Sequence, residues 1–238
     1  MQRTVGKIYG IALLSGGLDS LVSLAKANTS VNIKLALTFD YYQRSNKMEI
    51  ESAKKISEYY GLKHLVMKLS WLKDVTGTAL VDRRKKIPKF SIKDLDNKSK
   101  TLESSKDVWV PNRNAVFINI AASIAEGLGY KAIITGFNKE EAETFPDNSA
   151  GFIKAINESL RFSTLNGVEV LSPTQLINKA EIVKLGIELK VPFRYIYSCY
   201  LNSFDGKMCG VCESCQRLKR AFHRTGYYAL ISKRFKVA

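Results

Sequence analysis

The segment Ser15-Gly16-Gly17-Leu18-Asp19-Ser20 combines adjacent glycines with hydroxyl and carboxylate side chains, a set of groups that suits phosphate binding. An apolar run at residues 8–14 predicts a buried strand before it, and apolar residues at helical spacing in 21–25 predict a helix after it. A small-residue turn between a strand and a helix presents backbone N–H groups and the helix N-terminus to an anion. We therefore predict that residues 15–20, the phosphate loop, hold the phosphates of a nucleotide. The Walker P-loop and the Gly-x-Gly-x-x-Gly dinucleotide motif are excluded because this turn matches neither pattern.

A second chemical signal is the cysteine spacing near the end of the sequence. All four cysteines lie in one segment, as Cys199, Cys209, Cys212 and Cys215. Four thiolates satisfy a tetrahedral Zn²⁺ with Zn–S distances of about 2.3 Å and leave no open position, which indicates a structural metal. An iron–sulfur cluster uses the same ligands and remains an alternative, and a disulfide pair is less favoured still.

Composition limits the kind of partner. Basic residues outnumber acidic ones by 37 to 22 and give a formal net charge of +15, which attracts ATP, other anions or nucleic acid. The basic residues are scattered, so we expect a lysine-rich surface, small-molecule substrates and no stable nucleic-acid partner. The chain has only two histidines, His64 and His223, which gives a Ser-His or Cys-His mechanism little support.

Targeting signals are not recognisable in the sequence. No stretch approaches the roughly 20 apolar residues that a membrane-spanning helix needs. The first residues have no apolar core of a signal peptide. We expect a cytoplasmic location, where clustered cysteines bind metal more often than they form disulfides.

Regular elements that alternate along the chain must position these residues. The predicted strands are residues 8–14, 33–39, 64–69, 131–136 and 168–173. The predicted helices follow the phosphate loop and then occupy residues 48–60, 116–128, 152–165 and 178–189. This order predicts an α/β fold with a doubly wound, five-stranded, mainly parallel sheet. Functional residues in such sheets gather at the carboxyl ends of the strands, so the loops at Ser15, Asp40, Gly136 and Pro173 should share one edge.

Residues 70–108 interrupt this alternation. They are polar and charged, and we expect a mobile lid or disordered insertion because long structureless loops are unusual inside compact domains. The expected organisation is an ATP-binding α/β domain at residues 1–195 and a four-cysteine tail at 196–238.

Several motifs together resemble known families. The phosphate loop resembles the pyrophosphate-binding loop of the ATP pyrophosphatase, or PP-loop, superfamily. Other motifs, spread in order over the whole chain, are similar to those of the 7-cyano-7-deazaguanine synthase family: Phe39-Asp40-Tyr41-Tyr42-Gln43-Arg44, Val110-Pro111-Asn112-Arg113-Asn114, Phe145-Pro146-Asp147, Ser198-Cys199-Tyr200 and Cys209-Gly210-Val211-Cys212-Glu213-Ser214-Cys215. The resemblance implies an adenine nucleotide alpha-hydrolase-like fold with a small C-terminal zinc-binding element.

The same resemblance implies a carbon–nitrogen ligase that uses ATP with Mg²⁺. In that family the carboxylate of 7-carboxy-7-deazaguanine is adenylated, ammonia displaces AMP, and a second ATP activates the amide for elimination to the nitrile. The product serves queuosine or archaeosine synthesis in tRNA, and a homodimer is expected.

Residue roles follow from the resemblance position by position. The residues expected to bind ATP surround the phosphate loop: Leu14, Ser15, Gly16, Gly17, Leu18, Asp19, Ser20, Leu21, Val22, Ser23 and Leu24. Asp19, Ser20 and Lys179 are the expected catalytic residues, with Asp19 either capping the helix or ligating Mg²⁺. The metal ligands are Cys199, Cys209, Cys212 and Cys215.

Substrate recognition is assigned to Arg113, Asn114, Glu143 and Asp147. Glu140 and Glu141 are expected to be solvated loop residues. The sequence differs from the family pattern in this loop, because family members commonly have Ser-Gly-Tyr-Pro-Asp-Cys where this chain has Glu143-Thr144-Phe145-Pro146-Asp147-Asn148.

Two other functions compete with the nitrile-forming ligase. A tRNA-thiolating PP-loop enzyme is favoured by the positive charge, but it needs a free cysteine to carry sulfur. A nucleotide-regulated zinc-binding module without chemistry is the third hypothesis.

Overall fold

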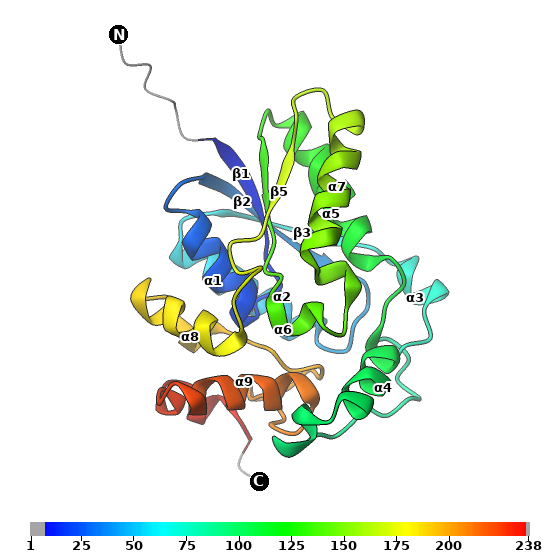
Figure 1. Cartoon of the computed structure of the whole chain (residues 1–238), viewed down its shortest axis with the longest axis vertical. Coiled ribbons are helices and arrows are strands. Elements are labelled where there is room, and N and C mark those ends of the chain that lie inside the picture. The colour runs from blue at the N-terminus through cyan, green and yellow to red at the C-terminus, as the bar shows by residue number, and fades with distance from the viewer. Residues whose placement is uncertain (1–7, 237–238) are drawn as a thin grey trace.

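Five parallel strands form one sheet in the computed structural model, which describes residues 8–236 (Figure 1). The strands are β1 (Tyr9–Leu13), β2 (Asn32–Asp40), β3 (Lys63–Lys68), β4 (Ala132–Ile134) and β5 (Glu169–Leu171). Their order in the sheet is β3-β2-β1-β4-β5, and every pair is parallel. The expected α/β fold with a five-stranded sheet is therefore confirmed. The chain reverses its direction of travel across the sheet between β1 and β4, which creates a switch point.

The helices cover both faces of this sheet (Figure 1). They are α1 (Leu18–Ala27), α2 (Asn46–Tyr59), α3 (Leu72–Val75), α4 (Lys98–Val108), α5 (Arg113–Gly127), α6 (Lys139–Ala142), α7 (Ala150–Ser163), α8 (Lys179–Glu188) and α9 (Glu213–Arg224). None of the helices in residues 8–236 is long and apolar enough to cross a membrane.

Alternation along the strands separates two apolar cores. Ala12 and Ala36 belong to the core with α1, α2 and α8, whereas Ile11, Leu35 and Leu37 belong to the core with α5 and α7. Successive side chains of a strand point to opposite faces, so the strands of a sheet covered on both sides are nearly continuous apolar runs. This is why the strands were recognisable as apolar runs.

Residues 70–108 differ from the structureless segment that the sequence predicts. They contain α3, the short 3₁₀ helix η1 (Lys93–Asp96) and α4. The segment is tied to the tail, because the Phe90 N–H donates to the Val211 carbonyl at 2.8 Å. The buried face of α4 consists of Thr101, Ser104, Ser105 and Val108, so it lacks the apolar stripe that identifies a helix from sequence.

The tail packs onto the α/β core instead of forming a core of its own. Leu218 and Phe222 of α9 are 1% and 0% exposed and join the same apolar cluster as α1 and α8. Phe193, just after α8, meets Phe222 edge-to-face with ring centroids 5.2 Å apart. Apolar contact therefore runs without interruption across the predicted boundary between residues 195 and 196.

Candidate active site

A cavity of about 290 Å³ opens at the carboxyl ends of the strands, at the switch point between β1 and β4. Its wall includes Leu14 and Ser15 after β1, Phe39 at the end of β2, and Gly136 after β4. This is where ligands bind in open parallel sheets. Of the four predicted loops, the cavity wall includes Ser15, Gly136 and Tyr41 beside Asp40, whereas Pro173 is not among the described residues that line it.

The backbone of the phosphate loop is held in place from two sides. Gly16 has φ of +81°, and a Cβ there would lie 2.7 Å from the Ser52 side chain on α2. The Gly16 carbonyl accepts hydrogen bonds from the Ser52 hydroxyl and the Tyr197 N–H, each at 2.8 Å. A glycine is required at this position because other residues rarely adopt this backbone and α2 leaves no room.

Close approach of a second loop shapes the other side of the phosphate loop. A Cβ on Gly136 would lie 2.6 Å from the Ser20 nitrogen. The hydroxyls of Ser15 and Ser20 lie 3.2 Å apart, and the Ser20 hydroxyl donates to the Gly17 carbonyl at 3.2 Å. Gly17 occupies the N-cap of α1 and no side chain caps that end. The first N–H groups of α1 are thus available to an anion in the cavity.

The expected catalytic residues Asp19 and Lys179 meet at the cavity wall. Lys179 Nζ lies 3.0 Å from Asp19 Oδ2 and 2.8 Å from Glu141 Oε1, and its side chain is 6% exposed. Asp19 does not cap α1, so the capping alternative for this residue is wrong. Its second oxygen, Oδ1, is buried and has no hydrogen-bond partner among the described residues.

Burial and charge act against each other in this cluster. Burial raises the pKa of Asp19 to about 6, although the Lys179 ammonium opposes that rise. Burial also opposes the charge on Lys179, but the carboxylates of Asp19 and Glu141 outweigh burial and raise its pKa. Lys179 therefore stays cationic beside a carboxyl group whose pKa is raised to about 6.

The residues expected to bind ATP divide into two sets. Leu14, Ser15, Gly17, Asp19 and Ser20 line the cavity. The others lie behind the loop: Leu18, Leu21, Val22 and Leu24 are core residues, Ser23 is buried, and Gly16 contacts α2. The first set lines the cavity, whereas the second packs behind the loop.

Aromatic side chains and the Arg113 guanidinium form a further part of the cavity wall. Arg113, Tyr41 and Phe117 line it, and Arg113 Nη1 donates to the Tyr41 hydroxyl at 3.2 Å. Burial opposes the Arg113 charge, but Tyr41 and Asp147 outweigh it and raise the Arg113 pKa. A guanidinium beside aromatic walls suits a planar ligand that carries a carboxylate.

The other predicted substrate residues are placed unequally. Asn114 lines the cavity and its Nδ2 donates to the Asp147 carbonyl at 3.4 Å. Asp147 lies next to the lining residue Asn148, and burial raises its pKa. Glu143 is exposed and is not one of the described residues that line the cavity. The structure does not bring Glu143 to the predicted site.

Sequence reasoning placed Glu140 and Glu141 in solvent, and the structure shows that this is wrong. Glu141 contacts Lys179, and Glu140 Oε2 lies 3.3 Å from Arg220 Nη2. Both glutamates belong to α6, whose N-cap Asn138 accepts from the Glu141 N–H at 3.0 Å. The Asn-x-x-Glu pattern at 138–141 is the signal that could have revealed this short helix.

Three further charged residues, Glu49, Glu213 and Arg217, line the cavity and were missed. Glu49 accepts hydrogen bonds from Ser45 and Gln43. These bonds lower the pKa of Glu49, but burial outweighs them and raises it. Arg217 pairs with Glu213 on α9 at 2.7 Å. Apolar spacing at Cys215, Leu218 and Phe222 indicates α9 in hindsight, but the cysteine motif concealed it.

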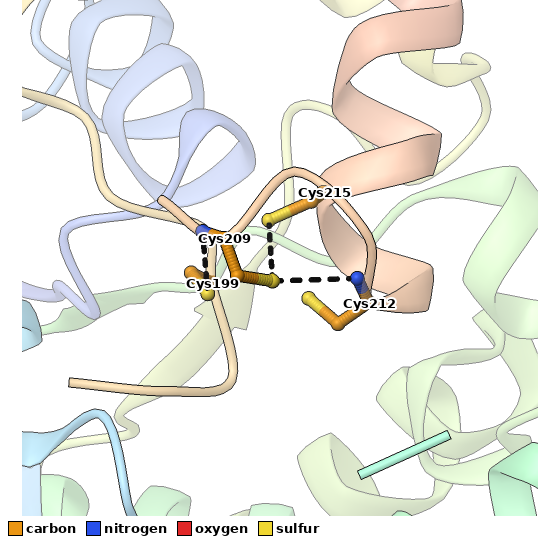
Figure 2. A group of neighbouring side chains, drawn as sticks. All are labelled: Cys199, Cys209, Cys212 and Cys215. Atoms are coloured by element: carbon orange, nitrogen blue, oxygen red, sulfur yellow. Dashed lines mark hydrogen bonds between the residues drawn. The ribbon is translucent and has the colours of Figure 1, made fainter. Parts of the chain in front are cut away.

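The four cysteines converge at the start of α9 (Figure 2). Their sulfur atoms all lie within 4.8 Å of one another, and Cys209 Sγ lies 3.8 Å from Cys215 Sγ. Tetrahedral zinc with Zn–S bonds of about 2.3 Å separates its sulfurs by about 3.8 Å. Backbone N–H groups of Cys209 and Leu201 donate to Cys199 Sγ at 3.4 Å, which favours a thiolate. The geometry suits a tetrahedral metal, and none of the cysteines is in a disulfide.

Known proteins are similar to this chain over nearly its whole length. The family model described as Queuosine biosynthesis protein QueC matches residues 9–226. The 7-cyano-7-deazaguanine synthase of Carboxydothermus hydrogenoformans is 52% identical over 211 residues, which are 89% of this chain and 96% of the relative. The proteins of the same name from Desulforamulus reducens and Methanosarcina mazei are 47% and 46% identical, and each alignment covers 91% of this chain and 94% of the relative.

Proposed function

Because the chain belongs to the Queuosine biosynthesis protein QueC family, we propose that it is an enzyme that makes 7-cyano-7-deazaguanine. Its substrates are 7-carboxy-7-deazaguanine, ammonia and ATP, and the reaction class is an AMP-forming carbon–nitrogen ligase. The observation that carries this proposal is the juxtaposition of Asp19 and Lys179 with a glycine-rich loop in one cavity.

The reaction needs charge stabilisation more than a protein nucleophile. A substrate carboxylate oxygen bonds to the α-phosphorus of ATP and pyrophosphate leaves. Ammonia then bonds to the acyl carbon, AMP leaves, and an amide forms. A second ATP adenylates the amide oxygen with release of pyrophosphate and one amide proton, and loss of AMP and the other amide proton gives the nitrile. Each step moves negative charge onto a leaving phosphate, which preorganised N–H groups and cations stabilise.

The described residues suit these roles. N–H groups of the phosphate loop, with the hydroxyls of Ser15 and Ser20, hold the departing pyrophosphate. The Lys179 ammonium supplies a fixed positive charge beside it. Arg113 binds the substrate carboxylate, and Tyr41 and Phe117 stack against the deazaguanine ring. Asn114 and Asp147 are the candidates for contacts with the ring edge.

Metal roles follow from the donor atoms. Asp19 Oδ1 lacks a partner within residues 8–236, and a carboxylate oxygen is the ligand type that Mg²⁺ prefers. When bound, Mg²⁺ supplies charge that neutralises the phosphates. The four thiolates suit Zn²⁺ in a closed structural site. A cytoplasmic location and a homodimer remain predictions from the sequence.

A thiolating reaction is less well supported. All four cysteines of the chain lie in one cluster. If a metal binds them all, no thiol remains to carry sulfur, so the ligase is preferred over tRNA thiolation. A regulatory module without chemistry does not account for a buried lysine at the cavity.

The test is mass spectrometry of the product formed from ATP, ammonia and 7-carboxy-7-deazaguanine. We expect a nitrile, AMP and pyrophosphate, and loss of turnover in Asp19→Asn with the metal content and melting temperature retained. Normal turnover in that variant would refute the role of Asp19. Absence of any nitrile from the metal-loaded protein would refute the function itself.

A further inference from the structure

Glu140 on α6 joins two helices that reach the cavity from distant parts of the chain. Its Oε1 accepts a hydrogen bond from the backbone N–H of Lys179 at 3.1 Å. Its Oε2 lies 3.3 Å from Arg220 Nη2 and 3.8 Å from Arg217 Nη1, both on α9. We propose that Glu140 is a positioning residue through which α9 holds Lys179 against the phosphate loop. This role rests on the proposed function, because it concerns how Lys179 is presented to the leaving phosphates.

At the α8 end, Glu140 fixes where the helix begins relative to α6. The N-terminus of α8 is already closed by a capping box between Asn178 and Glu181, so the helix does not need Glu140 in order to form. What Glu140 adds is a bond between α8 and α6. Its neighbour Glu141 holds the Lys179 side chain, so α6 grips Lys179 by backbone and ammonium together.

At the α9 end, the two arginines are themselves fixed. Cys212 and Cys215 flank the start of α9 at Glu213, and Glu213 accepts two hydrogen bonds from Arg217 at 3.0 and 2.7 Å. Glu213 also accepts a hydrogen bond from Ser104 on α4. The other face of α9 is buried in the apolar core. Packing and hydrogen bonds therefore hold α9 in the position from which its arginines contact Glu140.

Charged side chains form a series of contacts from the tail to the phosphate loop. The α9 arginines pair with Glu140, which accepts from the Lys179 N–H. The Lys179 ammonium in turn pairs with Glu141 and Asp19. Removing the Glu140 charge breaks the contact between α9 and α6, while Arg217 keeps Glu213 and Arg220 keeps Asp96 as partners. The start of α8 is then no longer fixed relative to α9. A displacement of about 1 Å in a catalytic group can cost about 100-fold in rate. The expected loss is in turnover, because Arg113 and the aromatic wall are untouched.

The test compares Glu140→Gln, Arg220→Gln and the double variant by steady-state kinetics. Glu140→Gln keeps an acceptor for the Lys179 N–H but removes the ion pairs. Arg220 is not among the described residues that line the cavity, so Arg220→Gln removes an ion pair of Glu140 without changing a residue of the cavity wall. Glu158→Gln is the matched control, because Glu158 pairs with Arg161 at 3.1 Å on the exposed surface of α7.

We expect kcat to fall about 10- to 100-fold in Glu140→Gln and less in Arg220→Gln, with KM for 7-carboxy-7-deazaguanine, metal content and melting temperature unchanged. The double variant should lose no more than Glu140→Gln alone, because residues that act in one series are not additive. The role would be overturned if kcat were unchanged in the single variants or if the effects multiplied in the double variant. It would also be overturned if each loss of kcat matched a loss of folded, metal-loaded protein. An inactive wild type would overturn the proposed function as well, whereas an active wild type with unaffected variants would overturn only the role of Glu140.

Discussion

At the scale of single residues, the site depends on a carboxyl group that the fold makes reluctant to ionise. Burial raises the pKa of Asp19 to about 6, and Lys179 is the cation that keeps the ionised form accessible. The ionised form is the one that attracts Mg²⁺ and Lys179. The proposed role of Asp19 in the reaction therefore requires its ionised form.

This balance predicts a pH dependence. Because the folded pKa lies above the ordinary value of 3.8, Asp19 favours the folded state below 3.8 and loses that contribution as pH rises through about 6. Activity should change with pH in the opposite direction to this stability contribution, because the proposed reaction needs the ionised carboxylate of Asp19. We expect kcat/KM to fall as pH drops below about 6, in a profile measured with saturating ammonia. A kcat/KM that stays constant well below that pH would contradict the assignment.

Gly136 offers a second prediction at this scale. An added Cβ would lie 2.6 Å from the Ser20 nitrogen, so Gly136→Ala must displace the start of α1. We expect destabilisation of about 1–3 kcal/mol, as for other overpacked sites, together with weaker ATP binding. Denaturant unfolding and nucleotide titration measure the two effects.

Gly151→Ala is the control for this variant. Its Cβ would meet only the Ser149 hydroxyl at 3.6 Å, inside α7. This change should keep stability and ATP affinity or raise stability slightly, because alanine is the better helix former. Equal ATP affinity in the two variants would mean that the close contact at Gly136 is not required.

At the scale of elements, periodic apolar patterns identified what packs on the sheet and missed what packs through polar atoms. The predicted strand and helix at residues 33–39 and 48–60 correspond to β2 and α2 within a few residues. In contrast, α6 is four residues long and fully polar in its first turn, so no period can reveal it. The phosphate loop and Lys179 were found through local motifs, whereas the pairing of Glu141 and Arg217 with the site depends on three-dimensional proximity alone.

The start of α9 gives a prediction at this scale. Cys212 is the N-cap of α9 and one of the four clustered thiols. We expect Cys212→Ser to lose bound metal and to lower Tm by roughly 10 °C, because metal binding and folding of the tail are coupled. Metal analysis and a thermal melt test this.

Chelation of the unmodified protein provides the comparison. A strong chelator should lower its Tm to about that of Cys212→Ser and should leave the variant unchanged. A variant with full metal content and an unaltered Tm would count against the metal site.

At the scale of the whole molecule, the tail and the α/β part of the chain share a buried core. Phe222 of α9 and Leu21 of α1 belong to one apolar cluster, although they lie on opposite sides of the predicted boundary. Shared cores unfold together. The sequence suggested a division at residues 195 and 196 because the cysteine motif marks the tail, and only the packing reveals the common core.

This sharing predicts a single melting transition in which metal release and loss of ATP binding coincide. Phe222→Ala should destabilise the whole protein by about 3–5 kcal/mol, since the side chain is fully buried. Phe204→Ala is the control, because Phe204 is fully exposed. Calorimetry with a metal-sensitive dye follows both events, and two well-separated transitions would contradict the shared core.

The wall of the cavity draws on residues from Leu13 to Arg217, which has a consequence for protein synthesis. A ribosome that adds about 5–20 residues per second completes Arg217 roughly 10–40 s after Leu13. During that interval the nascent chain has a glycine turn but neither Tyr197 to secure it nor Arg217 to face it. The wall of the cavity is therefore incomplete until translation has passed these residues.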